Sequence, residues 1–246
     1  MRFKLSLFFI ILANILLPKK NMNEINTIHL WGIRIDEPIV TLTDLLVSVL
    51  CFIYAYKIHK SGKSEKVFLY FKIYFFTMGL ATLLGGIIGH AFLYAFTFHW
   101  KLPGWIMSMI SIMFVERAAI EHTRIWLKPS VVKVFGVVNI IEFVTFLTLT
   151  IISLDFFYVE FHSGYGLMFV VLSLEGYLFL KTKNTAGKYM LAGIGFAAIA
   201  AIFFMTKISP HQWFNYLCVS HVLMAVAATF FYWGTMRIDM SVISKK

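Results

Sequence analysis

Hydrophobic positions run along this chain in long unbroken stretches, with no strand-like alternation between apolar and polar residues. Several windows of about 18 or more residues are nearly free of charge, which is the length a helix needs to cross a bilayer core of about 30 Å. Within lipid the backbone must satisfy its own hydrogen bonds, and unbroken runs favour helices over a barrel. The pattern predicts an all-α, polytopic membrane protein.

Seven of these stretches are expected to be transmembrane helices, and they cover residues 39–57, 67–95, 104–127, 131–153, 157–180, 187–206 and 211–235. The second is longer than a bilayer requires, so it should tilt or project beyond the lipid. The connections between the stretches are too short to hold a soluble domain. We therefore expect one seven-helix transmembrane domain over residues 39–236, an extracytoplasmic lead-in over 22–38 and a cytoplasmic tail over 237–246.

Residues 1–21 form a separate unit with a basic start and an apolar core. This composition resembles a signal peptide or a short extra anchor helix. The core is short for a true span and no clear cleavage site follows it. A start at Met22 is the other interpretation, and each of them leaves 22–38 on the outer side.

The charged residues predict the orientation of the bundle. The chain has a formal net charge of +10, yet only 14% of its residues are charged, against about 25% in soluble domains. Three alternate connections contain the basic residues Lys57, Lys60, Lys63, Lys66, Arg124, Lys128, Lys133, Lys181, Lys183 and Lys188. By the positive-inside rule these connections are cytoplasmic, which predicts an N-out, C-in bundle. Membrane lipids, and not nucleic acid, are the expected partners.

Ionisable residues inside the predicted spans are the main candidates for function, because they are costly in lipid and usually face the bundle interior. They are Asp44, His90, Glu116, Arg117, Glu121, His122, Glu142, His162, Glu175, His211 and His221. At about 1.5 Å per residue, Asp44 and His90 lie in the outer part of their helices, whereas Glu116 and Glu142 lie near the middle. Ser111 reaches an outer depth on the third helix.

The seventh predicted helix places His211, Asn215, Cys218 and His221 on one arc of about 120°. Zinc favours imidazole nitrogen together with a carboxylate or water. We therefore expect a zinc site with His90, His211 and His221 as metal ligands, near Asn215 and Ser111. The catalytic candidates are the carboxylates Glu116, Glu142 and Asp44. The simpler alternative is that each histidine only forms a hydrogen bond with a neighbouring helix.

Several of the other polar residues have structural interpretations. Glu121, Arg124 and His122 are spaced to pair along the cytoplasmic half of the third helix. Glu175 can extend toward the basic connection at 181–188. Asp44 can favour the start of its helix. The glycines Gly79, Gly85, Gly86 and Gly89 are expected to let a neighbouring helix approach closely.

Seven spans with a histidine on the second helix and HQWFN opening the seventh resemble the CREST superfamily of membrane hydrolases, which includes alkaline ceramidases and the progestin and adipoQ receptors. The family pattern is Ser-x3-His on helix two, an Asp on helix three and His-x3-His on helix seven, with three histidines holding zinc. His90 matches the helix-two histidine and His211 the first of the helix-seven pair. Gly86 stands at the serine position, Asn215 at the second histidine, and helix three offers Glu116 in place of Asp.

The chain is also similar to a bacterial multispanning group with GG-x-x-x-H on helix two and a helix-seven histidine such as that in VSHVLMA, residues 219–225. In that setting His221 is the second candidate imidazole of helix seven. This similarity implies a bacterial inner (cytoplasmic) membrane.

The resemblance implies a zinc-dependent hydrolase that acts on a lipid amide or a similar lipid bond. A bound zinc would lower the pKa of its water to about 7, and a carboxylate would serve as proton shuttle. The alternative is a non-enzymatic receptor or accessory binding protein with a degenerate metal site and a small lipid-like ligand. A third interpretation is a haem protein with His90 and His221 as axial ligands.

Overall fold

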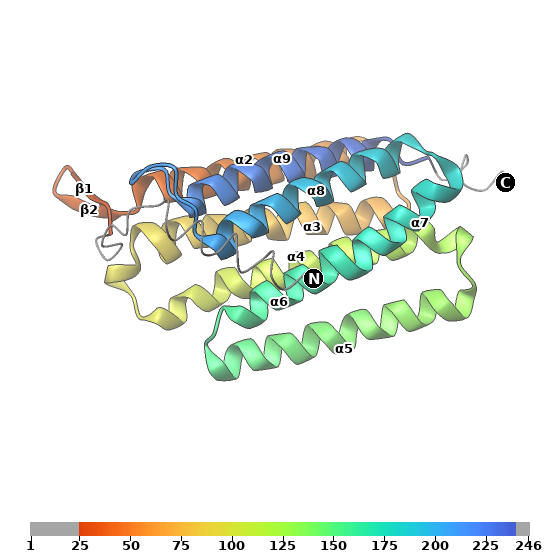
Figure 1. Cartoon of the computed structure of the whole chain (residues 1–246), viewed down its shortest axis with the longest axis horizontal. Coiled ribbons are helices and arrows are strands. Elements are labelled where there is room, and N and C mark those ends of the chain that lie inside the picture. The colour runs from red at the N-terminus through yellow and green to blue at the C-terminus, as the bar shows by residue number, and fades with distance from the viewer. Residues whose placement is uncertain (1–24, 240–246) are drawn as a thin grey trace, which may run out of the picture.

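The computed structural model describes residues 25–239. The expected leader over 1–21 and most of the expected tail lie outside these residues. In chain order the elements are the strands β1 (Thr27–Leu30) and β2 (Ile33–Asp36), then the helices α2 (Pro38–Lys60), α3 (Lys66–Leu84), α4 (Leu102–Thr123), α5 (Pro129–Ser153), α6 (Phe157–Tyr165), α7 (Leu172–Thr182), α8 (Thr185–Thr206) and α9 (Tyr216–Met236). Figure 1 shows the helices running lengthwise beside one another, with the hairpin at one end.

Within the described residues, seven helical segments are long and apolar enough to cross a membrane. They cover 38–60, 66–91, 98–126, 129–153, 157–182, 185–206 and 216–236. Each overlaps one of the seven predicted spans, so the prediction of a seven-helix bundle is confirmed. The apolar helices indicate an integral membrane protein.

The start of the seventh helix differs from the prediction. α9 begins at Tyr216, because the side chain of Asn215 accepts hydrogen bonds from the backbone N–H groups of Leu217 and Cys218 and so caps the helix. His211 therefore lies in the connection before α9 and is exposed. The expected arc of His211, Asn215 and His221 on one helix is wrong for His211.

The hairpin joins directly to the bundle. β1 and β2 pair antiparallel, with Thr27 opposite Asp36.

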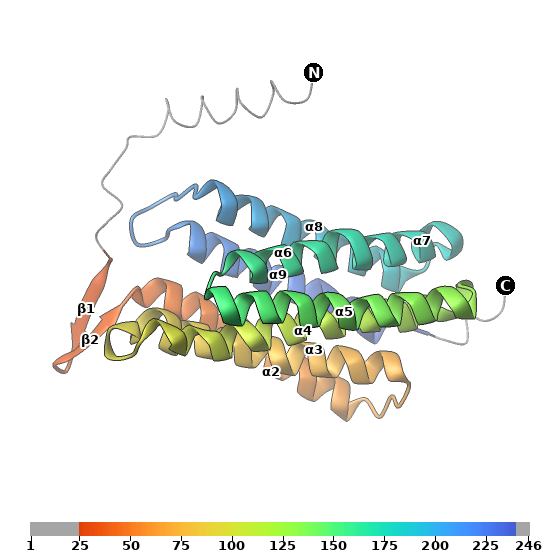
Figure 2. The same ribbon diagram turned by 90° about the horizontal axis from the view of Figure 1, so that it is seen from below.

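α9 packs against both α8 and α2, and α3 packs against both α2 and α4. α5 lies along the lower edge of the bundle in Figure 1, and in the view from below it crosses in front of the other helices (Figure 2).

An aromatic core holds α2, α3 and α9 together. Phe71, Phe75 and Phe231 are almost completely buried. Tyr54 of α2 stacks on Tyr232 of α9 with ring centroids 4.5 Å apart. Buried aromatic pairs of this kind stabilise a core by about 0.5–1.5 kcal/mol beyond their buried area. This half of the bundle is therefore a rigid base for the residues at its end.

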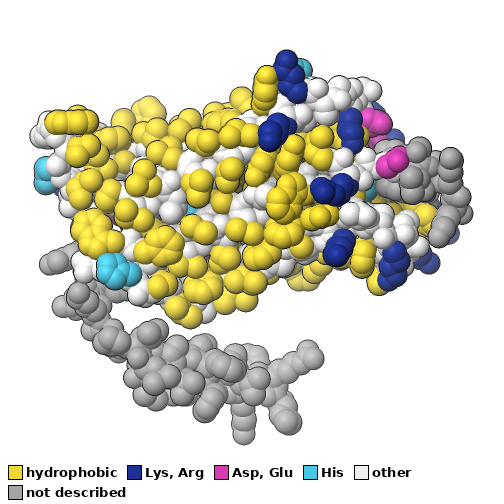
Figure 3. Space-filling view, turned by 90° about the horizontal axis from the view of Figure 1, so that it is seen from above, with side chains coloured by type: hydrophobic (Ala, Val, Ile, Leu, Met, Phe, Trp, Pro, Cys, Tyr) yellow, Lys and Arg dark blue, Asp and Glu magenta, His cyan; other side chains and the backbone are white. Residues whose placement is uncertain are grey.

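Lysine and arginine side chains gather at the end of the bundle opposite the hairpin (Figure 3). We name this the basic end and the other the hairpin end. Large apolar side chains such as Leu42, Ile152 and Leu180 are exposed along the flanks, as expected for a surface that faces lipid.

Two helices contain π-helical segments that the apolar pattern does not predict. The first, η1 (Gly85–Ala91), continues α3 toward the hairpin end, and the second, η5 (Gly166–Val171), joins α6 to α7. π-helical turns are rare and often lie at functional sites, because they widen the helix and redirect its side chains.

Candidate metal centre at the hairpin end

Glu37 connects the hairpin to α2 in an unusual backbone conformation. Its φ and ψ of 44° and 51° are left-handed, which for a residue other than glycine costs on the order of 1 kcal/mol. The hydrogen bond from the Glu37 N–H to the Asn26 carbonyl, at 2.7 Å, holds this turn. The carboxylate consequently reaches His90, where Oε2 lies 2.7 Å from Nδ1.

His90 is positioned by the π-helical segment η1. Within this segment, Gly86 packs directly against α2, since a Cβ added there would lie 2.9 Å from the Cβ of Asp44. Thr41 also donates a hydrogen bond to the Gly86 carbonyl at 3.2 Å. The predicted close approach at Gly86 is thus confirmed, and it brings the buried Asp44 carboxylate toward His90. The distance from His90 Nε2 to Asp44 Oδ2 is 3.8 Å.

His221 approaches the same carboxylate from α9. Its Nε2 lies 3.3 Å from Asp44 Oδ1, and its Nδ1 lies 3.1 Å from the hydroxyl of Thr43. The Thr43 hydroxyl donates its hydrogen to the Val40 carbonyl at 2.8 Å. It must therefore accept from His221, which places the imidazole proton on Nδ1.

The same argument applies to His90, because its Nδ1 faces a carboxylate that can only accept. Both rings then present an Nε2 lone pair toward Asp44, whose ionised oxygens are also acceptors. Three acceptor groups face one another with no donor between them. A cation, either a proton or a metal ion, is required there to remove the repulsion.

Two imidazoles and a carboxylate are ligand types that a divalent metal accepts. Asp44 lies 3.3 Å and 3.8 Å from the two imidazoles, near the roughly 3.4 Å between ligand atoms on a tetrahedral zinc, whereas the two ring centroids are 6.2 Å apart. Among the described residues only Glu116, Glu142 and His162 bring three such ligand atoms within 4.8 Å of one another, so Asp44, His90 and His221 would have to draw closer to share one ion. In metal sites the second imidazole nitrogen usually donates to a carboxylate, carbonyl or other acceptor that orients the ring. Glu37 and Thr43 stand in these positions.

The hairpin-end cluster, formed by Glu37, Thr43, Asp44, His90 and His221, is open on one side. The side chains of Glu37 and His90 are 26% and 18% exposed, whereas that of Asp44 is only 6% exposed. A fourth ligand, such as water or a substrate group, could therefore enter while Asp44 stays shielded. This is the arrangement expected of a catalytic site with three protein ligands and an open position.

His211, Asn215 and Ser111 are not brought into this cluster. The His211 Nδ1 accepts a hydrogen bond from the Trp213 N–H within its own connection. Asn215 uses its side chain as the cap of α9. Ser111 is buried on α4 and donates to the Ser108 carbonyl at 2.6 Å.

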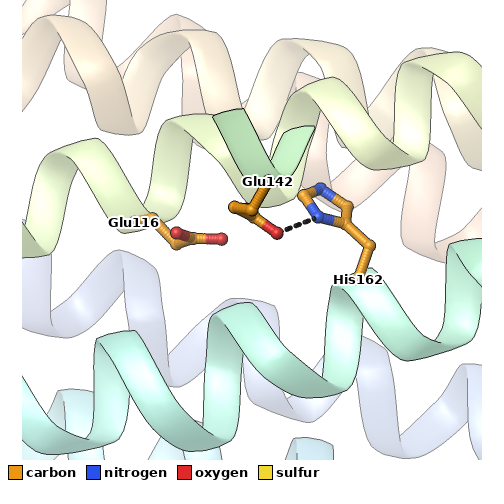
Figure 4. A group of neighbouring side chains, drawn as sticks. All are labelled: Glu116, Glu142 and His162. Atoms are coloured by element: carbon orange, nitrogen blue, oxygen red, sulfur yellow. Dashed lines mark hydrogen bonds and ion pairs between the residues drawn. The ribbon is translucent and has the colours of Figure 1, made fainter. Parts of the chain in front are cut away.

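Glu116 and Glu142 belong to a second cluster in another part of the bundle, where α4, α5 and α6 meet. Figure 4 shows the Glu142 carboxylate lying between Glu116 and the ring of His162. One donor atom from each of these residues lies within 4.8 Å of the others. With Asn139 we name them the mid-bundle cluster. Glu116 and Glu142 thus have partners other than His90 and His221.

A third pair corrects two expectations. His122 and Glu175 are completely buried and bind each other, with Nδ1 2.8 Å from Oε1. His122 therefore does not pair along the third helix as expected, and Glu175 does not extend to the basic connection at 181–188. The predicted pairing of Glu121 with Arg124 is confirmed, at 3.3 Å.

Comparison with known families gives a single classification. Residues 39–240 match a family of unknown function, DUF6962. The chain belongs to this family. The match covers the seven-helix bundle, the whole mid-bundle cluster and every residue of the hairpin-end cluster except Glu37. No curated protein and no solved structure matches the chain.

Proposed function

We propose that this protein is a membrane-embedded, metal-dependent hydrolase whose divalent ion is held by Asp44, His90 and His221. Zinc is the ion that the ligand types favour, since two imidazoles and a carboxylate form a common catalytic zinc set. One observation carries the proposal: both Nε2 atoms face the Asp44 carboxylate while both Nδ1 atoms are held by acceptors.

Each residue has a separate part in this mechanism. Glu37 fixes the tautomer and orientation of His90, and Thr43 does the same for His221. The buried Asp44 supplies the negative charge that makes a site with two neutral imidazoles attractive to a dication. When bound, the metal would polarise a carbonyl and activate a water.

The substrate class that fits this position is a lipid with an amide or ester bond. Asp44 lies six residues after the start of α2, about 9 Å along the helix from the hairpin end. The carbonyl groups that link acyl chains to lipid head groups lie at a similar depth in a bilayer. The distant kinship with membrane hydrolases implied by the helix-two histidine agrees with this choice.

For the orientation, we propose that the hairpin end faces outward from a bacterial cytoplasmic membrane. The support is the gathering of lysine and arginine at the opposite end, which the positive-inside rule places in the cytoplasm. A single cysteine in place of Trp31, at the exposed hairpin tip, tests this. The native Cys51 and Cys218 are buried, so an impermeant thiol reagent applied to intact cells should label only position 31.

The test of the function uses the full chain in lipid nanodiscs, stripped of metal and then reloaded with zinc. A panel of N-acyl and ester lipids should be hydrolysed by the loaded protein and not by the stripped one. His90→Ala and His221→Ala should each abolish both zinc retention and hydrolysis. His211→Ala is the matched control, because His211 is exposed outside the cluster, and it should retain both.

Two other outcomes would redirect the assignment. Zinc retention that depends on His90 without hydrolysis of any lipid would identify a metal-binding receptor or accessory protein. Such a result would agree with Gly86, which stands where the hydrolases that the sequence resembles have a serine. A Soret absorption band in the purified protein would instead identify haem bound by His90 and His221.

A further inference from the structure

We propose that the mid-bundle cluster of Glu116, Asn139, Glu142 and His162 is a second site for a divalent metal, separate from the hairpin-end cluster. The mid-bundle cluster lies among α4, α5 and α6 and shares no residue with the hairpin-end cluster, so this second site does not depend on the proposed function.

The tautomer of His162 directs its Nδ1 into the cluster. Its Nε2 lies 3.1 Å from the Met109 carbonyl, which can only accept, so the proton is on Nε2. The Nδ1 of His162 then lies 3.0 Å from Glu142 Oε2, so either a proton or a metal ion must lie between these two acceptor atoms. A histidine that donates one ring nitrogen to a backbone carbonyl and turns the other to a carboxylate has the orientation of a metal ligand.

Three further oxygen atoms of the cluster are acceptors without hydrogen-bond partners. Among the described residues, Glu116 Oε1, Glu142 Oε1 and Asn139 Oδ1 are buried and have no hydrogen-bond partner. The amide N–H groups of Asn139 donate to Glu116 Oε2 at 3.2 Å and to the Met113 carbonyl at 3.3 Å, so none is left for the three orphaned oxygens. Orphaned buried acceptors are costly, and a bound cation would satisfy those of Glu116 and Glu142, which lie close together beside His162.

The burial pattern of α5 sets these residues apart from ordinary packing. α5 lies at the lipid-facing edge of the bundle, and its buried residues are Asn139, Glu142 and Thr150. All three are polar, whereas its apolar residues that pack inward, such as Val132 and Phe135, are only partly buried. A helix held to its neighbours by packing alone would bury small or apolar residues.

Gly166 shows that space is reserved for one of the ligands. A Cβ at this position, the first of η5, would overlap the Glu116 carboxylate and a methyl group of Ile112. The π-helical segment and its glycine therefore let the buried carboxylate turn toward α5.

The ligand set favours a manganese- or iron-type ion. It offers one imidazole nitrogen, two carboxylates and an amide oxygen, and carboxylate oxygen suits Mn²⁺ while imidazole suits iron and zinc. Two carboxylates also balance the charge of one dication, which matters far from water. The Glu142 side chain is 9% exposed, against 0% for His162, so Glu142 is the less deeply buried of the two ligands.

The experiment uses Mn²⁺ as the probe on stripped, full-length protein in nanodiscs. To separate the two sites, it is done in the His90→Ala/His221→Ala double variant, which lacks the hairpin-end ligands. We expect one Mn²⁺ per chain by equilibrium dialysis. Pulsed electron paramagnetic resonance should detect the nitrogen of a single imidazole.

Substitutions within the cluster identify the ligands in that background. Glu142→Gln and Glu116→Gln keep the side-chain volume and should each lower Mn²⁺ affinity more than tenfold. His162→Gln should remove the imidazole signal. Glu121→Gln is the matched control on α4, since Glu121 pairs with Arg124 outside the cluster, and it should leave the affinity unchanged.

The proposal is overturned if the double variant binds no Mn²⁺, or if Glu142→Gln leaves its Mn²⁺ binding unchanged. It is also overturned if the bound Mn²⁺ shows no imidazole signal. In the first case the carboxylates and His162 share protons and serve only to hold α5 against the bundle. Failure of Mn²⁺ to bind here, with zinc retained at the hairpin end of the protein that keeps His90 and His221, would leave the proposed function standing.

Discussion

The hairpin-end cluster and the mid-bundle cluster are built in the same way at two different depths. In each, a glycine in a π-helical segment makes room for a buried carboxylate from a neighbouring helix: Gly86 for Asp44, and Gly166 for Glu116. In each, a histidine has one ring nitrogen held by an acceptor and the other turned toward a carboxylate.

The clusters differ in access and in the number of imidazoles. The hairpin-end cluster has two histidines, each oriented by its own acceptor, and is partly exposed. The mid-bundle cluster has one histidine and is enclosed by α4, α5 and α6. An open site with a free position suits chemistry on a substrate, whereas an enclosed site with more acceptors suits permanent binding. If both proposals hold, turnover belongs to the open hairpin-end cluster and permanent metal binding to the enclosed mid-bundle cluster.

Removal of the central carboxylate should have the largest effect. Asp44→Asn should lower zinc affinity by at least about 100-fold, since loss of a group that only orients a metal ligand already costs about 10–100-fold. The amide N–H group can donate to an Nε2 lone pair, so the metal-free variant should remain folded. Isothermal titration with a competing chelator measures the affinity; retained tight binding would contradict the role of Asp44.

Filling the two glycine positions should separate the clusters. Gly86→Ala should destabilise the protein by about 1–3 kcal/mol through overpacking and weaken zinc binding, while leaving Mn²⁺ binding at the mid-bundle cluster intact. Gly166→Ala should also destabilise the protein, but it should weaken Mn²⁺ binding at the mid-bundle cluster and leave zinc binding at the hairpin-end cluster intact. Denaturation in detergent and metal titration provide the measurements.

Gly89→Ala is the control for both substitutions, because nothing lies within 4 Å of a Cβ placed there. It should be neutral or stabilising by up to about 1 kcal/mol. If Gly86→Ala were equally harmless, the packing of Asp44 against η1 would not position the site.

Loss of an orienting group should have a smaller effect than loss of a ligand. Glu37→Gln and Thr43→Val should each weaken zinc binding by about 10–100-fold. Thr43→Ser keeps the acceptor for the His221 Nδ1–H and should restore the affinity. Equal binding by the valine and serine variants would show that Thr43 does not orient His221.

The smallest expected effect concerns pH and the hairpin. Partial burial raises the pKa of the Asp36 carboxyl, but hydrogen bonds from Arg34 and Thr27 outweigh this and hold its pKa below the ordinary 3.8. A carboxyl with a lowered folded pKa stabilises the hairpin above pH 3.8, and this stability is lost as pH falls through the folded value. A nitroxide label at position 31 should become more mobile only in that acidic range. Asp36→Asn should remove the pH dependence.

The bundle could be predicted because long uncharged runs have few structural solutions in lipid. Asp44 and His90 were recognisable as costly polar residues at similar outer depths, whereas His221 was expected nearer the middle of the seventh helix. Glu37 was not, since it lies outside the apolar runs and acts through a left-handed turn. The helix start at Asn215 was readable in principle from the preceding Ser209-Pro210 and from the capping preference of asparagine.

The mid-bundle cluster could not be assembled from sequence. Glu142 and His162 meet only because α5 folds back on α6, and the apolar pattern does not specify how a lipid-facing edge helix is rotated. The same holds for His122 and Glu175, whose pairing depends on α4 lying beside α7. The π-helical segments leave no mark in a continuous apolar run.

The most direct test of the central claim is zinc K-edge X-ray absorption of the loaded protein, compared with the same protein carrying His90→Ala and His221→Ala. Mutation of Glu142 to Gln in both samples removes zinc from the mid-bundle cluster. The account predicts four-coordinate zinc with two imidazoles at about 2.0–2.1 Å in the first sample, and no bound zinc in the second. Zinc with an unchanged spectrum after loss of both histidines would contradict it, as would a first sample that takes up no zinc.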